Sequence, residues 1–363
     1  MNFPDLHHLL KIQKDLWQWP KSRAAVMIGT GFSRNAVPKP GVTTRFPLWR
    51  ELAKSMFDEL NPPQLGETEK AKKERENRFC NSNPLRIASE YDAEFKRMRL
   101  NQLLQTQIPN DDFLTGRLHE LLLRLPWVDV FTTNYDTLLE KTNVPNRSYR
   151  LVVKASDLPI AFSPRIIKLH GSFPSHTPFI ITEDDYRRYP IDFAPFVNTV
   201  QQSLLENTFV LLGFSGDDPN YLAWIGWIRD ELGYLHAPIY LVGLLSLSNA
   251  DRLLLEQRGV TPIDLSPLFK GGDSSEEKHA ASTDWFLSSL LNAQTSRPEQ
   301  WPTLERNVVP EIKGMPSFPV IDEDIPVPLK QNVSSQDLIA VSTEDGFKRV
   351  VVRWQYERLH YPG

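Results

Sequence analysis

The sequence "PWVDVFTTNYDTLLE", residues 126–140, joins an apolar run to small polar side chains and then to leucines at helical spacing. The apolar run predicts a buried strand, and the leucines predict a helix directly after it. Four small polar residues stand between the two, namely Thr132, Thr133, Asn134 and Asp136. Because ligands bind beyond the carboxyl ends of parallel strands in open α/β sheets, this stretch predicts both a fold and a site.

Further apolar runs along the chain predict strands of the same kind. Most of them are continuous rather than alternating, which is typical of strands covered by helices on both faces. Helices or loops separate the runs, and this alternation predicts a Rossmann-like, doubly wound parallel sheet of the α/β class. The predicted strands are residues 24–28, 127–131, 150–153, 165–169, 208–213, 238–244 and 259–265.

Helical periodicity outside these runs predicts a helical insertion and a C-terminal extension. We expect residues 1–290 to form one nucleotide-binding catalytic domain, with a second small helical lobe inserted at about 46–125. Within that insertion, residues 61–80 are polar and predict an exposed loop or a solvated helix, and residues 112–126 are leucine-rich and predict a helix. Residues 291–363 are rich in proline and predict an extension of mixed structure that contacts a partner or another copy.

The composition excludes several classes of protein. Lys and Arg number 41 against 45 Asp and Glu, a net charge of −4, so direct nucleic-acid binding is not expected. A single cysteine, Cys80, excludes an internal disulfide and any zinc site built on several cysteines, and the scattered histidines predict no metal site. No apolar run reaches the roughly 18 residues of a membrane-spanning helix, and the N-terminus lacks the pattern of a signal peptide. We therefore expect a cytoplasmic protein.

The first candidate motif is a glycine turn after the first strand. It contains Gly29, Thr30, Gly31, Phe32 and Ser33, and a turn of this kind lets backbone N–H groups approach a diphosphate. Arg34 stands where the six-residue dinucleotide fingerprint requires glycine or alanine, and the P-loop pattern is absent. A tight strand-to-helix turn without a ligand explains the same residues.

Three more polar sets follow predicted strands. Asn134 and Asp136 suit a ligand role, although helix capping explains one of them. His170, in "RIIKLHGS", is a residue type that acts as a base near neutral pH, although a lone histidine at a strand end is often structural. The segment "GFSGDDPN" from residue 213 either binds a ligand close to its backbone or forms a plain turn. A fifth segment, "FIITEDDYRRY" at 179–189, predicts an acidic turn that leads into a helix.

The glycine turn and the three polar sets are more informative together than singly, because they follow successive buried strands. They predict one crevice lined by a phosphate turn, an amide and carboxylate, a histidine and a second glycine turn. In this order the motifs resemble those of the sirtuin family over roughly residues 20–265. The matching segments are the glycine turn at 29–33, Thr133-Asn134-Tyr135-Asp136, Leu169-His170-Gly171, and Gly213-Phe214-Ser215.

Departures from the sirtuin pattern indicate the subclass. Deacylating sirtuins carry four cysteines on a zinc module, which this chain lacks, and the segment after the glycine turn differs from theirs. "PLWREL", "TTNYD" and "TEDDY" are instead similar to the sirtuin-like domains of bacterial anti-phage defence proteins. That resemblance implies an NAD⁺ glycohydrolase that yields nicotinamide and ADP-ribose, depletes NAD⁺ in abortive infection, and requires no metal.

The resemblance also implies roles for single residues. Asn134 would hold the nicotinamide ribose and position water, His170 would act as base, and Asp136 would orient the carboxamide or its neighbours. The remaining residues would bind the substrate. Gly29, Gly31 and Ser33 would bind the diphosphate, and Gly213, Ser215 and Asp217 the adenosine side. Thr30, Phe32 and Thr133 would also contact the dinucleotide.

Two other functions stay open at this point. One is protein deacylation or ADP-ribosyl transfer at the same site, and the other is a non-catalytic sensor of NAD⁺ or ADP-ribose. An unrestrained NAD⁺ hydrolase would kill its host, so we expect control by self-association into a homo-oligomer or by a separately encoded partner. The resemblance implies a HerA-like ATPase or an Argonaute as such a partner.

Overall fold

The computed structural model describes residues 3–18, 21–64, 66–145, 147–174, 178–213, 236–269 and 274–291, with the backbone of 340–341 and 350–351. The chain divides into two compact units, Met1–Glu311 and Ile312–Gly363. In the second unit, β10 (Ala340–Val341) pairs antiparallel with β11 (Val350–Val351). All elements described below belong to the first unit.

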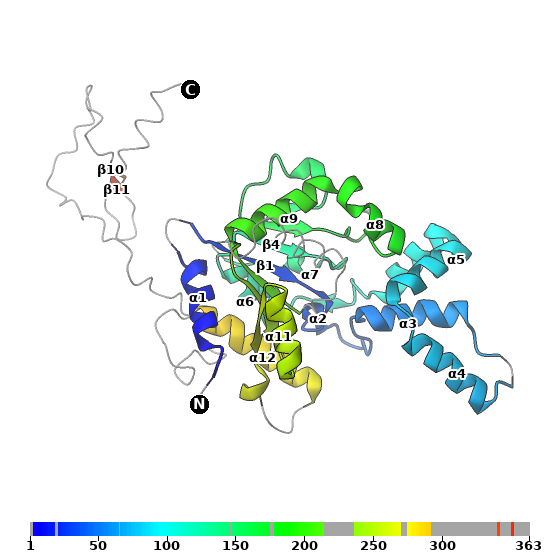
Figure 1. The fold of residues 1–363 in the computed structure, drawn as a ribbon. Coiled ribbons are helices and arrows are strands. Elements are labelled where there is room, and N and C mark those ends of the chain that lie inside the picture. The colour runs from blue at the N-terminus through cyan, green and yellow to red at the C-terminus, as the bar shows by residue number, and fades with distance from the viewer. Residues whose placement is uncertain are drawn as a thin grey trace. The chain divides into compact units, whose positions relative to one another are not determined.

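A seven-stranded sheet forms the centre of the first unit (Figure 1). Its strand order is β5-β6-β4-β1-β7-β8-β9, and every neighbouring pair is parallel. This arrangement confirms the predicted doubly wound parallel sheet. The strands are β1 (Ala24–Ile28), β4 (Asp129–Thr132), β5 (Arg150–Val152), β6 (Arg165–Lys168), β7 (Thr208–Leu212), β8 (Ile239–Gly243) and β9 (Val260–Asp264).

Both faces of the sheet are covered, which explains why its strands are apolar throughout. Along β1, Ala24, Val26 and Ile28 enter one hydrophobic core while Ala25 and Met27 enter another. This alternation follows from the two-residue period of a strand. The first core receives side chains from α1 (Leu6–Leu16), α6 (Arg117–Arg124) and α12 (Ser275–Leu291), and the second from α8 (Glu183–Asp192), α9 (Ala194–Glu206) and α11 (Asn249–Gln257).

The strand order changes direction at β1, which lies between β4 and β7. The register pairs Ile28 with Thr132 on one side and with Leu212 on the other. The residues that follow these three therefore lie next to one another at the carboxyl edge of the sheet. Such a switch point is where open α/β sheets bind their ligands.

The helices α3 (Trp49–Leu60), α4 (Glu69–Cys80) and α5 (Pro84–Gln107) form a helical lobe beside the sheet (Figure 1). Side chains of α3 and α5 share a hydrophobic core that includes Met56 and Tyr91. No residue of α4 is buried, so of the two alternatives for 61–80, an exposed loop or a solvated helix, the structure shows the helix over Glu69–Cys80. The lobe corresponds to most of the predicted insertion at 46–125, whereas α6 packs into a core of the sheet.

The single helix predicted over 112–126 is wrong at its start. Residues Phe113–Leu114 form β3, which pairs antiparallel with β2 (Val37–Pro38), and α6 begins only at Arg117. Gly116 separates the two elements, and a Cβ there would lie 2.7 Å from the carbonyl oxygen of Asn35. This close approach requires glycine, so the chain turns before the leucine-rich period becomes a helix.

Candidate functional site

The polar residues after β1 and β4 form one buried hydrogen-bonded cluster. The Asn134 Nδ2 group donates to the Gly29 carbonyl at 3.0 Å and to the Ser33 hydroxyl at 2.9 Å. The Ser33 hydroxyl donates in turn to Asp136 Oδ2 at 2.7 Å. All three side chains are buried. Asn134, Ser33 and Asp136 therefore hold one another in fixed orientations beside the short helix α2 (Thr30–Ser33).

The orientation of Asn134 leaves its carbonyl oxygen available. Both N–H bonds of the side-chain amide are used by the contacts to Gly29 and Ser33, so Oδ1 points elsewhere. Among the residues that the structure describes, Asn134 Oδ1 is buried and has no hydrogen-bond partner. An acceptor without a partner inside a protein is costly unless a hydroxyl or water satisfies it. Asn134 Oδ1 thus marks a point where a bound hydroxyl would be favoured.

Both oxygens of the Asp136 carboxylate accept hydrogen bonds from neighbouring residues. Its Oδ1 accepts the Leu138 backbone N–H at 3.1 Å, at the start of α7 (Leu138–Lys141). Its Oδ2 receives the Ser33 hydroxyl. The carboxylate therefore caps a short helix and orders the neighbouring turn at once.

The two glycine turns pack directly against each other. The Gly31 N–H donates to the Gly213 carbonyl at 3.1 Å, and the Gly29 N–H donates to the Leu212 carbonyl at 3.1 Å. Gly213 has a φ of +63°, and a Cβ on it would lie 2.5 Å from the Phe32 nitrogen. The amides of Gly29 and Gly31, predicted to face a diphosphate, are thus engaged with β7 and its turn. Thr30 is the first residue of α2, a position whose N–H has no partner inside the helix.

His170 follows β6 and lies within an aromatic frame. Its side chain is buried, and the rings of Tyr186 and Tyr189 contact it edge-on at centroid distances of 5.4 and 5.6 Å. The Tyr189 hydroxyl donates to the Leu169 carbonyl at 2.8 Å, and the Ile180 N–H donates to the His170 carbonyl at 3.2 Å. Two aromatic rings and a backbone hydrogen bond therefore hold His170 in place. Sequence reasoning missed both tyrosines, although they lie in "FIITEDDYRRY".

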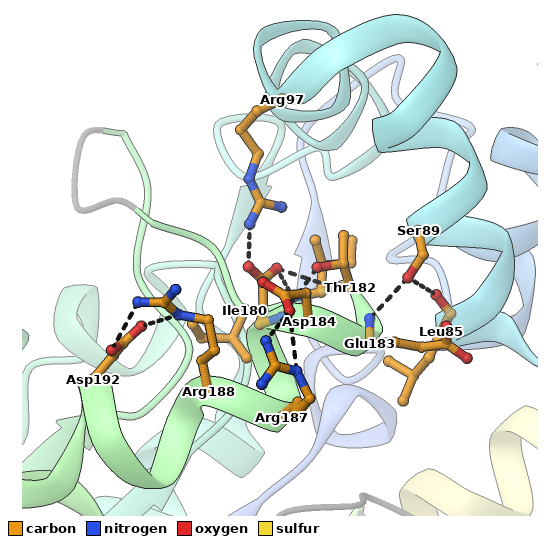
Figure 2. A network of polar contacts seen from close by, with 12 residues as sticks. Leu85, Ser89, Arg97, Ile180, Thr182, Glu183, Asp184, Arg187, Arg188 and Asp192 are labelled. Atoms are coloured by element: carbon orange, nitrogen blue, oxygen red, sulfur yellow. Dashed lines mark hydrogen bonds and ion pairs between the residues drawn. The ribbon is translucent and has the colours of Figure 1, made fainter.

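The acidic part of that segment is structural, as the turn interpretation predicted. Thr182 caps α8 within a network of polar contacts (Figure 2). The Asp185 carboxylate accepts the Ile181 and Thr182 N–H groups, each at 3.0 Å. Asp185 also pairs with Arg97 of α5. Burial alone would raise the pKa of Asp185, but Arg97 and these two amides lower it below its usual value. The segment thereby ties the helical lobe to the helix that frames His170.

Two further buried groups near the cluster were not singled out from the sequence. The Lys168 Nζ contacts the Asp136 carbonyl oxygen and pairs with Glu140 at 3.0 Å. The His119 Nδ1 accepts the Gly116 N–H at 3.2 Å, and its ring lies 5.1 Å from that of Phe32. Burial lowers the pKa of His119 to about 4, although the Asp136 charge opposes this shift. The only signal in the sequence was a lysine within the apolar run "RIIKL".

A cavity of about 1200 Å³ opens beside the glycine turns. Its walls are the 30–32 turn, Gly213, the end of β8 at Gly243, the start of α3, and the N-terminal half of α12. Pockets that bind small ligands have volumes of several hundred cubic ångströms, and this cavity is at least as large. Asn134, Asp136 and His170 do not line it. The cavity thus extends from the switch point toward β8, while the polar cluster lies toward β4 and β6.

Thr133, Ser215 and Asp217 are the remaining predicted site residues. Thr133 is half-buried at the end of β4. Ser215 and Asp217 lie outside the described residues. Within the described ranges, no group of three or more His, Cys, Asp or Glu side chains is placed to hold a metal ion. In the same ranges no helix has both the length and the apolar character needed to cross a membrane.

The fold and the strand-end cluster agree with the comparison to protein families. Residues 128–263 match the family described as SIR2-like domain. This match supports the resemblance to sirtuins drawn from the motifs.

Several curated proteins are similar to parts of this chain. Over 106 residues the chain is 39% identical to "NAD(+) hydrolase ThsA" of Acinetobacter baumannii, an alignment that covers 28% of this chain and 22% of that protein. It is 30% identical over 221 residues to the protein of the same name from Enterococcus faecium, covering 58% and 41%. "Defense-associated sirtuin 2" of Bacillus subtilis is 25% identical over 197 residues, covering 51% and 19%. The alignments span less than half the length of each of these relatives.

Proposed function

We propose that this chain is an NAD⁺ glycohydrolase that depletes NAD⁺ in anti-phage defence. The observation that carries the proposal is the fixed Asn134 side chain, whose carbonyl oxygen has no partner among the described residues. Thr132 of β4 pairs with Lys168 of β6. Asn134 lies two residues after Thr132, and His170 lies two residues after Lys168, so both follow the ends of neighbouring strands. The names of the relatives support the same reaction.

The chemistry requires little acid catalysis. Nicotinamide leaves the ribose as a neutral molecule when the C1′–N bond breaks, and C1′ gains oxocarbenium character. Water then forms the new C1′–O bond and loses one proton, which gives ADP-ribose, nicotinamide and H⁺. We infer that Asn134 Oδ1 accepts a hydrogen bond from the ribose hydroxyl or from this water, and that His170 takes the proton.

In this proposal, Ser33 and Asp136 act through Asn134. Their hydrogen bonds keep the amide oxygen directed toward the substrate, and preorganised polar groups of this kind supply much of the rate enhancement of enzymes. We assign substrate binding to residues 29–32, Thr133 and Gly213, with the adenosine half in the cavity beside β8. Ser215 and Asp217 keep their predicted place on the adenosine side.

The experiment for the proposal is product identification. Purified protein is incubated with NAD⁺, and separately with NAD⁺ and an acetyl-lysine peptide, and the products are separated by chromatography. We expect nicotinamide and ADP-ribose in both, with the peptide unchanged. Deacylated peptide would indicate a protein deacylase, and NAD⁺ binding without any product would indicate a sensor.

We further propose that the protein acts in the cytoplasm and is controlled by self-association or by a separate defence partner such as a HerA-like ATPase or an Argonaute. The edge of the sheet at β5 supports an interface, because Leu151, Ile160 and Phe162 are exposed there by 44%, 75% and 70%. Sizing chromatography with light scattering, combined with the activity assay, tests this. A monomer that stays fully active at every concentration would contradict it.

A further inference from the structure

Arg34 lies at the wall of the cavity and is held by carboxylates from two different elements. It pairs with Glu51 of α3, and its Nη1 lies 3.5 Å from Glu276 of α12. Its Nε donates to the Phe46 carbonyl at 3.2 Å, which fixes the guanidinium in place. Arg34 occupies the position at which the six-residue dinucleotide fingerprint has glycine or alanine. The cavity wall therefore has a cationic side chain at a position where proteins with that fingerprint have none.

Arg45 completes a ring of alternating charges with the same two carboxylates. It pairs with Glu51 at 2.8 Å and also with Glu276. The Glu51 carboxylate also accepts the Leu48 N–H at 2.8 Å, and it belongs to the folded start of α3. Among the residues that the structure describes, no backbone N–H donates to Glu276, and its side chain is 60% exposed on the first turn of α12. Of the two counter-ions of Arg34, Glu276 is therefore the one that an incoming anion can replace.

His279 of α12 lines the same cavity as Arg34 and lies within reach of its charge. The pKa of His279, which also lines the cavity on α12, is lowered by burial and by the charge of Arg34. The N-terminal residues of α12 up to Ala281 are mostly exposed, whereas its C-terminal residues are buried in the core. The first turn of α12, which carries Glu276, is therefore open to solvent.

We propose that Arg34 binds the diphosphate of the dinucleotide and that Glu276 is the intrinsic competitor that this diphosphate displaces. The inference rests on the proposed function for its substrate. A guanidinium recognises phosphate through paired N–H donors. When a diphosphate replaces the exposed Glu276 carboxylate, the charge of Arg34 stays compensated. Arg34 is accordingly a residue that determines specificity, and Glu276 sets the substrate concentration at which the site fills.

The test measures binding of ADP-ribose and of adenosine by calorimetry to the wild type, E276Q, R34Q and the double variant. ADP-ribose contains the diphosphate and adenosine does not, so the difference between them isolates the phosphate contact. We expect E276Q to tighten ADP-ribose binding about 3- to 10-fold and R34Q to weaken it about 10-fold, with adenosine unchanged. The E276Q gain should vanish when Arg34 is replaced as well.

A matched control is E74Q on the exposed helix α4, where Glu74 pairs with Lys70 at 4.0 Å. It should leave both ligands unaffected. Unchanged or weaker ADP-ribose binding by E276Q would overturn the inference, and because Glu276 is exposed this arm stands even if R34Q folds poorly. Binding needs no turnover, so a protein that follows this pattern without cleaving NAD⁺ would refute the proposed function and leave the inference intact.

Discussion

The Asn134 side-chain amide donates a 2.9 Å hydrogen bond to the hydroxyl of Ser33, a residue 101 positions earlier in the chain. The bond joins the turn after β1 to the turn after β4, and it fixes which end of the amide points away. Asp136 secures the arrangement from the other side by accepting the Ser33 hydroxyl. The orientation of the proposed catalytic amide thus depends on two residues that need not touch the substrate.

Replacing Ser33 with Ala, or Asp136 with Asn, should therefore lower kcat more than it changes KM. Misplacement of a catalytic group by about 1 Å costs as much as ~100-fold in rate, so we expect kcat to fall about 10- to 100-fold. Steady-state kinetics with NAD⁺ checks this. Ser203→Ala is the control, because Ser203 is as buried as Ser33, both 4% exposed, but lies in α9. Equal kcat in S33A and wild type would refute the coupling.

Gly213→Ala should destabilise the protein strongly. The residue has a φ of +63°, and the new Cβ would meet the Phe32 nitrogen at 2.5 Å, so the strain of the backbone adds to a clash. We expect a loss of more than about 2 kcal/mol in the free energy of unfolding, measured by urea denaturation. Gly41→Ala is the matched control, since Gly41 has a φ of +86° with open space around it and should lose only about 1 kcal/mol. Similar losses at both positions would show that the two glycine turns are not closely packed.

Lys96→Gly should stabilise the helical lobe. Lys96 interrupts α5 with a φ of 69° and a ψ of 158°, a conformation that glycine alone adopts readily. Relief of this strain should raise the free energy of unfolding by about 1 kcal/mol. Lys96→Ala removes the same side chain without relieving the backbone, so it should give no gain. Equal free energies of unfolding for the two variants would contradict backbone strain at Lys96.

The sequence was sufficient for the sheet and for the positions of the strand-end motifs. Continuous apolar runs such as "TFVLL" predict strands covered on both faces, and each of them became a strand. β3 was missed because a two-residue strand has no period of its own and merges with the leucines of α6. The tie between Ser33 and Asn134, and the tyrosines around His170, could not be predicted, since they depend on strand register and helix placement.

In weakly acidic solution, His119 should bind a proton when the protein unfolds. The pKa of this histidine is lowered to about 4 in the folded protein from 6.5, so the unfolded chain binds the proton first as the pH falls. Its contribution to stability is present above pH 6.5 and is lost as the pH falls from there toward about 4. His119→Gln does not titrate, so its free energy of unfolding should fall less steeply over this range. Parallel pH profiles from urea denaturation would contradict a neutral buried imidazole.

The most direct test of the central claim is NAD⁺ turnover by Asn134→Ala and His170→Ala beside the wild type, with NAD⁺ binding and thermal unfolding measured on the same preparations. The account predicts that wild type releases nicotinamide and ADP-ribose, and that each variant loses at least about 100-fold in kcat. Both variants should keep the fold and still bind NAD⁺. Wild-type turnover in both variants would contradict the assignment of Asn134 and His170 as the catalytic pair.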